Sequence, residues 1–214
     1  MTILGRLMSF FPLLNLTLVI IAFFNFVFDP SAMTALLVPV SAYAFPLVCF
    51  HIHQYRFPLK EGLSSISRGY SPWYGSHMIQ NMFLTFPAFE RFLRFIPGAF
   101  SAWLRLWGSE IGSGVHWTSQ FELSDRGLLV IGDNCVFGYD VRMTSHAVTP
   151  SAKHGMKVYV KRIRIEDNAF VGATSRIGPG VVVEEGALVG AVSDLFPNKI
   201  VRKNDHRKKK VAAS

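Results

Sequence analysis

One histidine stands out as a side chain that could move protons. His146 closes the run Met143-Thr144-Ser145-His146 and directly precedes an irregular segment from Ala147 to Lys161. An imidazole with an ordinary pKa of about 6.5 exchanges its proton readily at neutral pH, so it suits a general base. A position beneath a long surface segment would let a substrate reach it. We therefore expect His146 to be catalytic, and the alternative is a solvated histidine at a corner of the chain.

A general base needs a partner on its second ring nitrogen, because that partner fixes which nitrogen carries the proton. Two upstream carboxylates are candidates, Asp125 and Glu122, since both would lie one layer below His146 if the chain stacks in successive coils. Asp125 is the first choice. It has an equally good alternative role as the capping residue of the turn Ser124-Asp125-Arg126-Gly127.

The element that must position these residues is a repeat with a period of six. Within residues 108–200 an apolar residue recurs at every sixth position, often followed by glycine, with a two-residue slip before Ile131 and the irregular segment after His146. An α-helix repeats every 3.6 residues and a hairpin strand every two, so neither has this period. A parallel sheet wound into triangular coils does, with three hexads per coil and corners at Asp133-Asn134, Asp167-Asn168 and Pro179-Gly180. The phased residues are Ile111, Trp117, Leu123, Ile131, Phe137, Met143, Ile165, Val171, Ile177, Val183 and Val189.

These hexads, with the stretch Ile131-Gly132-Asp133-Asn134-Cys135 and the rung from Ile165 to Gly172, resemble the hexapeptide-repeat acyltransferases, whose fold is a left-handed parallel β-helix. The likeness is to the sugar O-acetyltransferases of the maltose and galactoside kind, which place a histidine at the position of His146 and an aromatic residue at that of Phe170. The handedness comes from the resemblance, since crossovers between parallel strands are normally right-handed. The family's C-terminal Gly-Asn-Pro-Ala-Lys element is replaced here by Val201-Arg202-Lys203-Asn204-Asp205.

The resemblance implies an enzyme that transfers an acyl group from acetyl-CoA, or another acyl-CoA, to a hydroxyl of a sugar or lipid-linked glycan. It also implies a homotrimer that binds the donor between subunits, and neither a metal nor a nucleic acid is expected. Corner geometry is the competing explanation for the glycines at the donor site, and contact with anionic lipid for its basic residues. The donor-site residues would be Phe170, Gly172, Ala173, Gly190 and Ala191, with Lys199, Arg202 and Lys203 at the nucleotide phosphates.

Two other functions remain open. A catalytically silent β-helix could assemble partners at a membrane, although an intact His146 beside a covering segment argues against it. Carbonic anhydrases that share this β-helix bind zinc through three histidines, and His116, His146 and His154 are the candidates here. His146 and His154 lie eight positions apart, which exceeds the spacing of the last ligand pair in those enzymes. A zinc-dependent hydratase is therefore the least favoured function.

The N-terminal quarter of the chain is apolar enough to enter a membrane. The 214 residues are 50% hydrophobic and 17% charged, with a mean hydropathy of +0.29, which is unusual for a soluble protein. No charged residue lies between Leu7 and Phe28 or between Met33 and Ile52, and each stretch can cross a hydrocarbon core of about 30 Å. Residues 1–56 are therefore predicted to form a transmembrane helical hairpin. A cleaved signal peptide is the alternative for the first stretch.

The flanking charges predict the orientation of this hairpin. Arg6 precedes it, and Arg56 and Lys60 follow it, so both ends are expected in the cytoplasm. The repeat domain would then lie on the cytoplasmic side of the inner membrane as part of a multi-pass protein. Residues 201–214 form a basic tail. Two cysteines, Cys49 and Cys135, are too few for a disulfide scaffold or a Cys-rich zinc site.

Residues 57–107 connect the hairpin to the repeat. After a Gly/Ser-rich stretch from Gly62 to Gly75, apolar residues recur at helical spacing with arginines on the other side. Such a stripe is typical of an amphipathic helix lying in the headgroup plane of a membrane, and Pro97 should kink or split it. The alternative is that the stripe packs under the repeat domain. Its members are Phe89, Phe92, Leu93, Ile96, Phe100, Trp103, Leu104 and Trp107.

Overall fold

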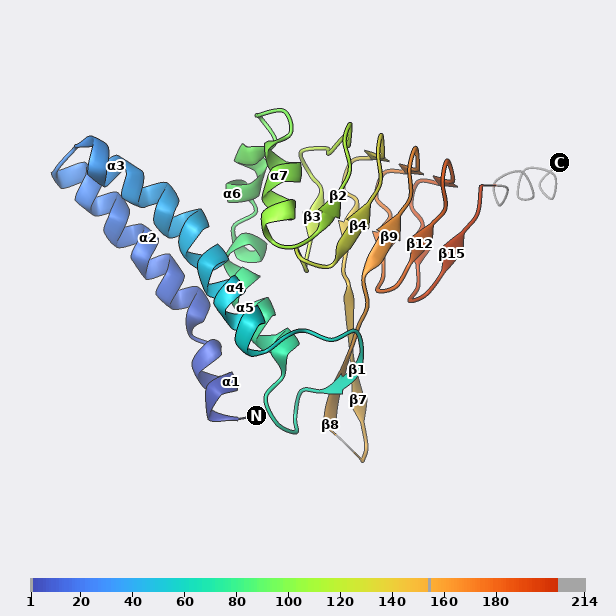
Figure 1. Cartoon of the computed structure of the whole chain (residues 1–214), viewed down its shortest axis with the longest axis horizontal. Coiled ribbons are helices and arrows are strands. Elements are labelled where there is room, and N and C mark those ends of the chain that lie inside the picture. The colour runs from blue at the N-terminus through green and yellow to red at the C-terminus, as the bar shows by residue number, and fades with distance from the viewer. Residues whose placement is uncertain (1, 154, 204–214) are drawn as a thin grey trace. The chain divides into compact units, whose positions relative to one another are not determined.

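The computed structural model describes residues 2–153 and 155–203, and the chain divides into two compact units (Figure 1). Of the described residues, the first unit comprises 2–60, 64–86, 150–153 and 155–157, and the second comprises 61–63, 87–149 and 158–203. Helices dominate the first unit, and short strands dominate the second. His154 of the zinc alternative, and the basic tail beyond residue 203, lie outside the described residues.

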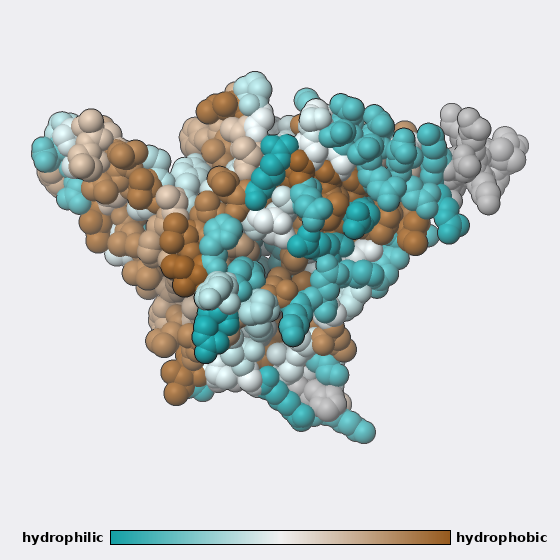
Figure 2. Space-filling view, in the orientation of Figure 1, coloured by the Kyte–Doolittle hydropathy of each residue, from teal (hydrophilic) through white to brown (hydrophobic). Residues whose placement is uncertain are grey.

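The first unit contains the two apolar helical stretches that the sequence predicts. α1 (Ile3–Met8) and α2 (Phe11–Phe28) form one, and α3 (Ala32–Pro39), the π-helical segment η1 (Val40–Ala44) and α4 (Phe45–Arg56) form the other. Together they span Ile3–Phe28 and Ala32–Arg56, 26 and 25 residues that are long and apolar enough to cross a membrane. Hydrophobic surface gathers over these helices (Figure 2). α2 packs along α3, and Ser31 caps the first turn of α3.

Helix α5 (Pro72–Thr85) packs against α1, α2 and α4 and completes the first unit. This helix was not predicted, because the glycines and serines near its start are typical of a connector. Ser71 caps its first turn by accepting a hydrogen bond from the Tyr74 amide. Gly75 is needed inside the helix, since a methyl group there would collide with the Tyr70 hydroxyl and the His53 imidazole, which hydrogen-bond to each other at 2.6 Å.

The second unit is a coil of parallel strands, as the six-residue period predicts. Its three sheets have the strand orders β2-β4-β9-β12-β15, β5-β10-β13 and β3-β6-β11-β14. Val171 pairs with Val189 and Ile165 pairs with Val183, so partners on these neighbouring coils are three hexads apart. The strands are β2 (Glu110–Ile111), β3 (Glu122–Leu123), β4 (Leu129–Ile131), β5 (Val136–Phe137), β6 (Arg142–Met143), β9 (Ile163–Ile165), β10 (Phe170–Val171), β11 (Arg176–Ile177), β12 (Val182–Val183), β13 (Leu188–Val189), β14 (Asp194–Leu195) and β15 (Ile200–Val201).

Each coil buries its phased apolar residues and turns at corners with a left-handed backbone conformation. Ile131, Phe137 and Met143 are at most 2% exposed. Glycine and asparagine adopt positive φ at low cost, which suits them to these corners. The predicted corner residues Asn134, Asn168 and Gly180 all have it. Between residues 168 and 198 a positive φ recurs at every sixth position, at Asn168, Thr174, Gly180, Gly186, Val192 and Asn198.

The segment from residue 147 to 161, which the sequence analysis treats as irregular, is a β-hairpin. β7 (His146–Ser151) and β8 (Gly155–Val160) join β1 (Gly62–Ser65) in a sheet of order β1-β8-β7. Near its tip the Met156 amide donates to Ser67 Oγ, and the Ile66 amide donates to the Met156 carbonyl, both at 2.9 Å. Backbone pairing therefore orders a segment that has no six-residue phase.

Two short helices, α6 (Ala88–Leu93) and α7 (Ala99–Leu106), precede the first coil. They separate at Pro97 and Gly98, and Gly98 has a φ of 79°, so the predicted split is confirmed. α7 packs against β2. The part of the apolar stripe that lies in and next to α7 therefore packs under the repeat domain, which is the alternative given above. The apolar residues buried there are Phe100, Trp103, Leu104 and Trp107, each at most 6% exposed.

A buried ion pair joins α6 to the coil. Glu90 Oε1 lies 2.6 Å from Arg126 Nε, and Glu90 Oε2 accepts from Arg126 Nη2 at 2.8 Å. The indole of Trp103 on α7 donates to the same carboxylate at 2.9 Å. Glu90 is 4% exposed and Arg126 is 0% exposed. A charge that is buried this deeply is tolerated only when it is paired and hydrogen-bonded.

Removing one partner of this pair should destabilise the second unit strongly. Glu90→Leu is expected to lower the free energy of unfolding by about 3–5 kcal/mol, because it leaves the Arg126 charge buried without its carboxylate. Adding Arg126→Met removes that charge, so the double variant should be more stable than Glu90→Leu alone. Urea unfolding of the detergent-solubilised protein, followed by tryptophan fluorescence, measures both values. Purely additive losses in the double variant would contradict the coupling.

The stacking of the coils makes a second prediction about stability. A Cβ atom on Gly138 would lie 2.6 Å from the Ala173 amide nitrogen, whereas one on Gly178 would lie 3.0 Å from the nearest atom, the Leu195 carbonyl oxygen. Gly138→Ala should therefore cost about 1–3 kcal/mol through overpacking, and the matched variant Gly178→Ala should cost less. The melting temperatures of the two variants test this, and equal losses would be inconsistent with it.

Candidate active site

Strand register brings Asp125 and His146 together. β3 pairs with β6 so that Leu123 faces Met143 on the next coil. Asp125 lies two residues beyond Leu123, and Ser145 lies two residues beyond Met143. The Ser145 amide accordingly donates to Asp125 Oδ2 at 2.9 Å, and His146 follows as the first residue of β7.

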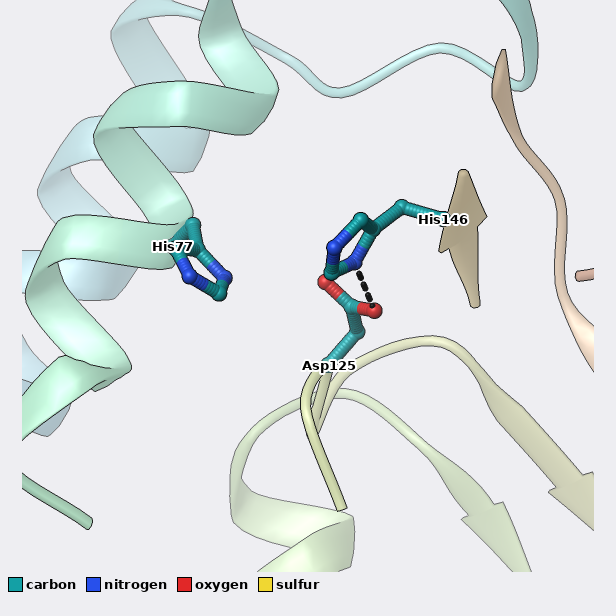
Figure 3. A group of neighbouring side chains, drawn as sticks. All are labelled: His77, Asp125 and His146. Atoms are coloured by element: carbon teal, nitrogen blue, oxygen red, sulfur yellow. Dashed lines mark hydrogen bonds and ion pairs between the residues drawn. The ribbon is translucent and has the colours of Figure 1, made fainter. Parts of the chain in front are cut away.

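The two side chains form a short hydrogen-bonded pair (Figure 3). His146 Nδ1 lies 2.7 Å from Asp125 Oδ2, and the Asp125 side chain is 4% exposed while that of His146 is 17% exposed. Thr144 Oγ1 lies 3.3 Å from the same nitrogen and donates to the His146 carbonyl. His77, also drawn in the figure, belongs to α5 of the first unit.

This geometry selects the tautomer of the neutral imidazole. A carboxylate only accepts hydrogen bonds, so the proton of neutral His146 belongs on Nδ1, facing Asp125. Nε2 then carries the lone pair that can take a proton from a substrate. If Nε2 does so, the negative charge of Asp125 stabilises the resulting imidazolium. The pair can therefore act as an oriented general base.

The turn that carries Asp125 is held from several sides. The Leu128 amide donates to the Asp125 carbonyl at 3.3 Å, and Ser145 Oγ donates to the Leu128 carbonyl at 3.2 Å. Ser109 Oγ donates to the carbonyl of Arg126 at 2.6 Å, and the side chain of Arg126 is the one paired with Glu90. Glu90 and Ser109 were not predicted as supports, because both are distant in the chain from Asp125.

Glu122, the second candidate partner, lies elsewhere. It is on the outer face of β3, where its Oε2 is 3.4 Å from Nε of Arg142 on β6. The same sheet face carries the Arg176 and Asp194 ion pair at 2.6 Å. Glu122 therefore belongs to a solvent-exposed charge ladder across β3, β6, β11 and β14, and the structure places Asp125 alone of the two carboxylates beside His146.

The residues predicted to bind the donor fall into two groups. Gly172, Ala173, Gly190 and Ala191 meet at one corner of two consecutive coils, where the Val192 amide donates to the Ala173 carbonyl. A methyl group on Gly172 would collide with the backbone of Ala191, so coil stacking by itself requires this glycine. Phe170 precedes that corner on β10, 41% exposed.

The basic residues of the predicted donor site lie at other corners. Arg202 Nε is 3.6 Å from Glu184 Oε1, and the Lys203 side chain runs beside Gly186 on the same coil edge. Lys199 follows the corner at Asn198, between β14 and β15. These three side chains are thus at the C-terminal end of the coil but not at the corner formed by Gly172 and Gly190.

Among the described residues, His116 of the zinc alternative lies apart from any group of potential metal ligands. His116 is exposed and forms a parallel bridge with Val136, at the start of the β5 sheet. Within residues 2–153 and 155–203, no grouping of metal-binding side chains includes His116. His154 lies outside the described residues.

Part of the repeat matches a model of a known protein family. Residues 162–191 match the family model described as the hexapeptide repeat of succinyl-transferase. The chain carries a hexapeptide repeat. This confirms the resemblance predicted from the hexads. The matched residues include the strands β9, β10, β11, β12 and β13. Among curated proteins, none matches the chain in sequence.

Solved structures of hexapeptide-repeat proteins are similar to this chain. A hexapeptide-repeat acetyltransferase from Vibrio cholerae is 16% identical, with 54% of this chain and 84% of that chain covered and a TM-score of 0.36. A galactoside acetyltransferase in complex with coenzyme A is 16% identical over 56% and 82% of the two chains, with a TM-score of 0.35. A maltose O-acetyltransferase from Clostridium difficile 630 is 16% identical over 56% and 80%, with a TM-score of 0.26.

The Asp125–His146 contact predicts a measurable tautomer. Nitrogen NMR of the histidine side chains should show His146 with its proton on Nδ1 when the imidazole is neutral, because Asp125 accepts that proton. Asp125→Asn offers an amide in place of the carboxylate and should shift the population towards the Nε2-protonated form. An unchanged tautomer in Asp125→Asn would show that the carboxylate does not orient the ring.

Proposed function

We propose that this protein is a membrane-anchored O-acyltransferase with acyl-CoA, most simply acetyl-CoA, as the donor. The observation that carries the proposal is the 2.7 Å contact between His146 Nδ1 and Asp125 Oδ2 on the coil. A buried carboxylate that orients a partly exposed imidazole is the arrangement expected of a general base. The match of residues 162–191 to a succinyl-transferase repeat supports acyl transfer as the reaction class.

In the proposed reaction, His146 Nε2 takes the proton of the acceptor hydroxyl while the hydroxyl oxygen attacks the thioester carbonyl. Asp125 stabilises the imidazolium that forms, and its own position is fixed by the Ser145 amide. When the tetrahedral intermediate collapses, the carbon–sulfur bond breaks and the proton on Nε2 passes to the leaving thiolate. The products are an ester of the acceptor and free coenzyme A, and His146 returns to its neutral form.

The donor is proposed to lie along the corner formed by Gly172, Ala173, Gly190 and Ala191, with Phe170 beside it. Small residues let a ligand approach the backbone closely. Lys199, Arg202 and Lys203 would meet the nucleotide phosphates as charge-assisted partners. In the proposed assembly the coil winds left-handed, and three copies close around a threefold axis so that each groove lies between neighbours.

The acceptor is proposed to be a hydroxyl of a sugar, carried by a lipid-linked glycan at the cytoplasmic face of the inner membrane. Two stretches of the chain, Ile3–Phe28 and Ala32–Arg56, have the length and composition of membrane spans. An enzyme anchored in the bilayer meets a lipid-linked acceptor at a raised effective concentration. A trimer would carry six such spans.

A silent scaffold is the rival function. It would need the coil and the anchor but no oriented base, so the fixed Asp125–His146 pair favours the enzyme. The two functions separate in one assay, the release of free thiol from acetyl-CoA in the presence of membrane glycolipid. A scaffold releases none above the background rate.

His146→Ala is expected to lower turnover by about 10²- to 10⁴-fold, the usual contribution of a positioned general base. The substitution removes a group that meets the hydroxyl and not the donor nucleotide, so the affinity for acetyl-CoA should change little. His116→Ala is the matched control, because His116 is an exposed histidine of the same repeat domain. Thiol release and donor binding are measured on trimeric protein. Wild-type turnover in His146→Ala would reject the mechanism.

The proposed topology is tested by cysteine labelling on intact cells. In a Cys49→Ala, Cys135→Ala background, Pro30→Cys at the hairpin tip should react with a maleimide that cannot cross the membrane. Tyr139→Cys on the coil is 60% exposed and should react only after the cells are permeabilised. The reverse pattern would place the coil outside the cell, away from acyl-CoA.

A further inference from the structure

The second unit exposes a small apolar cluster at the end of α6. Phe92, Phe95 and Ile96 are 63%, 79% and 63% exposed, and the rings of Phe92 and Phe95 contact each other with centroids 6.2 Å apart. Single exposed apolar side chains are ordinary, but three neighbouring large ones at a helix end mark an interaction surface. Hydrophobic surface is visible there at the upper end of α6 (Figure 2).

The cluster is held out on a rigid support. Arg94, between Phe92 and Phe95, donates from Nη1 to the Ser119 carbonyl at 2.8 Å and from Nη2 to the Phe121 carbonyl at 3.0 Å. Its guanidinium also lies 4.2 Å from the centre of the Phe100 ring. Burial lowers the pKa of Arg94 to about 10, so the side chain stays charged at neutral pH. The apolar side chains therefore point outward because the helix end is fixed in that position.

The charges around the cluster are of one sign. Residues 87–109 contain three arginines, Arg91, Arg94 and Arg105, and one acid, Glu90. Glu90 is 4% exposed and is neutralised by Arg126, so it contributes no negative charge to the surface. Arg91 and Arg94 are next to the cluster in the chain, whereas Arg105 is in the last turn of α7 and donates to the Ile111 and Gly112 carbonyls. An apolar tip flanked by arginines is complementary to a bilayer with anionic headgroups.

We propose that Phe92, Phe95 and Ile96 insert into the surface of an anionic lipid bilayer. The proposal rests on the membrane anchoring argued above, which tethers the second unit to a bilayer. It replaces the expectation of a whole amphipathic helix in the headgroup plane, since α7 buries its apolar face in the second unit. The contact would be a second, shallow attachment that fixes the coil relative to the membrane surface.

Site-specific quenching tests the insertion on the full chain in lipid nanodiscs that contain phosphatidylglycerol. In the Cys49→Ala, Cys135→Ala background, an environment-sensitive fluorophore is attached at Phe95→Cys. Phosphatidylcholine spin-labelled near the top of the acyl chain should lower its emission by about twofold or more, because interfacial segments sit at that depth. The same fluorophore at Tyr139→Cys, on the coil, is the control and should be quenched little.

Three outcomes would overturn the insertion. With phosphatidylcholine spin-labelled near the end of the acyl chain, a probe at Ile21→Cys, within the first apolar stretch, reports the anchor separately. Quenching at position 21 without quenching at position 95 would reject the insertion and leave the anchor intact, whereas no quenching at either position would reject both. A blue-shifted probe at position 95 that spin-labelled lipid does not quench would show that a protein surface covers the cluster, and this too would overturn the proposal.

Discussion

The buried ion pair between Glu90 and Arg126 is the contact on which both the site and the surface of the second unit depend. Arg126 directly follows Asp125, so the pair fixes the turn that presents the carboxylate to His146. Glu90 lies in α6, so the same pair fixes the helix whose end exposes Phe92 and Phe95. A buried pair is a modest source of net stability, but it permits only one arrangement of the groups it joins. Positioning is therefore its main contribution here.

The period of six was sufficient to predict the coil. One inward apolar residue per hexad is a demand of triangular geometry, and no other regular structure imposes it, so Val171, Ile177 and Val189 could be placed in the core from their spacing. The family match at residues 162–191 falls in the most regular part of this series. The first coils, where the spacing slips between Leu123 and Ile131, were harder to phase.

The slip also explains why the partner of His146 stayed open. Asp125 and Glu122 differ by three residues, and only the register of β3 against β6 decides which of them reaches the next coil. Side chains on a strand alternate in direction, so Glu122 faces outward to Arg142 while its neighbour Leu123 faces inward. Sequence spacing does not reveal that register where the repeat is broken.

The remaining features could not be predicted from the sequence, because they depend on contacts between residues that are distant in the chain. Helix α5 begins among glycines and serines that favour a loop locally, and its contacts with α1, α2 and α4 override that preference. The hairpin of β7 and β8 has no phase of its own, and its pairing with β1 depends on residues about ninety positions away. The glycines proposed to face a ligand could be explained either by ligand binding or by coil geometry. The close stacking of Gly172 on Ala191 requires a glycine for structural reasons.

The hairpin arm leaves the coil and returns to it without disturbing the register. Ile131 pairs with Ile165, 34 positions later, in the same way that Ile165 pairs with Val183, 18 positions later. Stacking of the coils requires only that the residues before and after the hairpin lie at a fixed separation. It does not constrain the length or the sequence of the hairpin itself. His146 is at the coil edge, and the segment that follows it belongs to the arm. The arm is therefore an insertion whose length the register of the coil does not constrain.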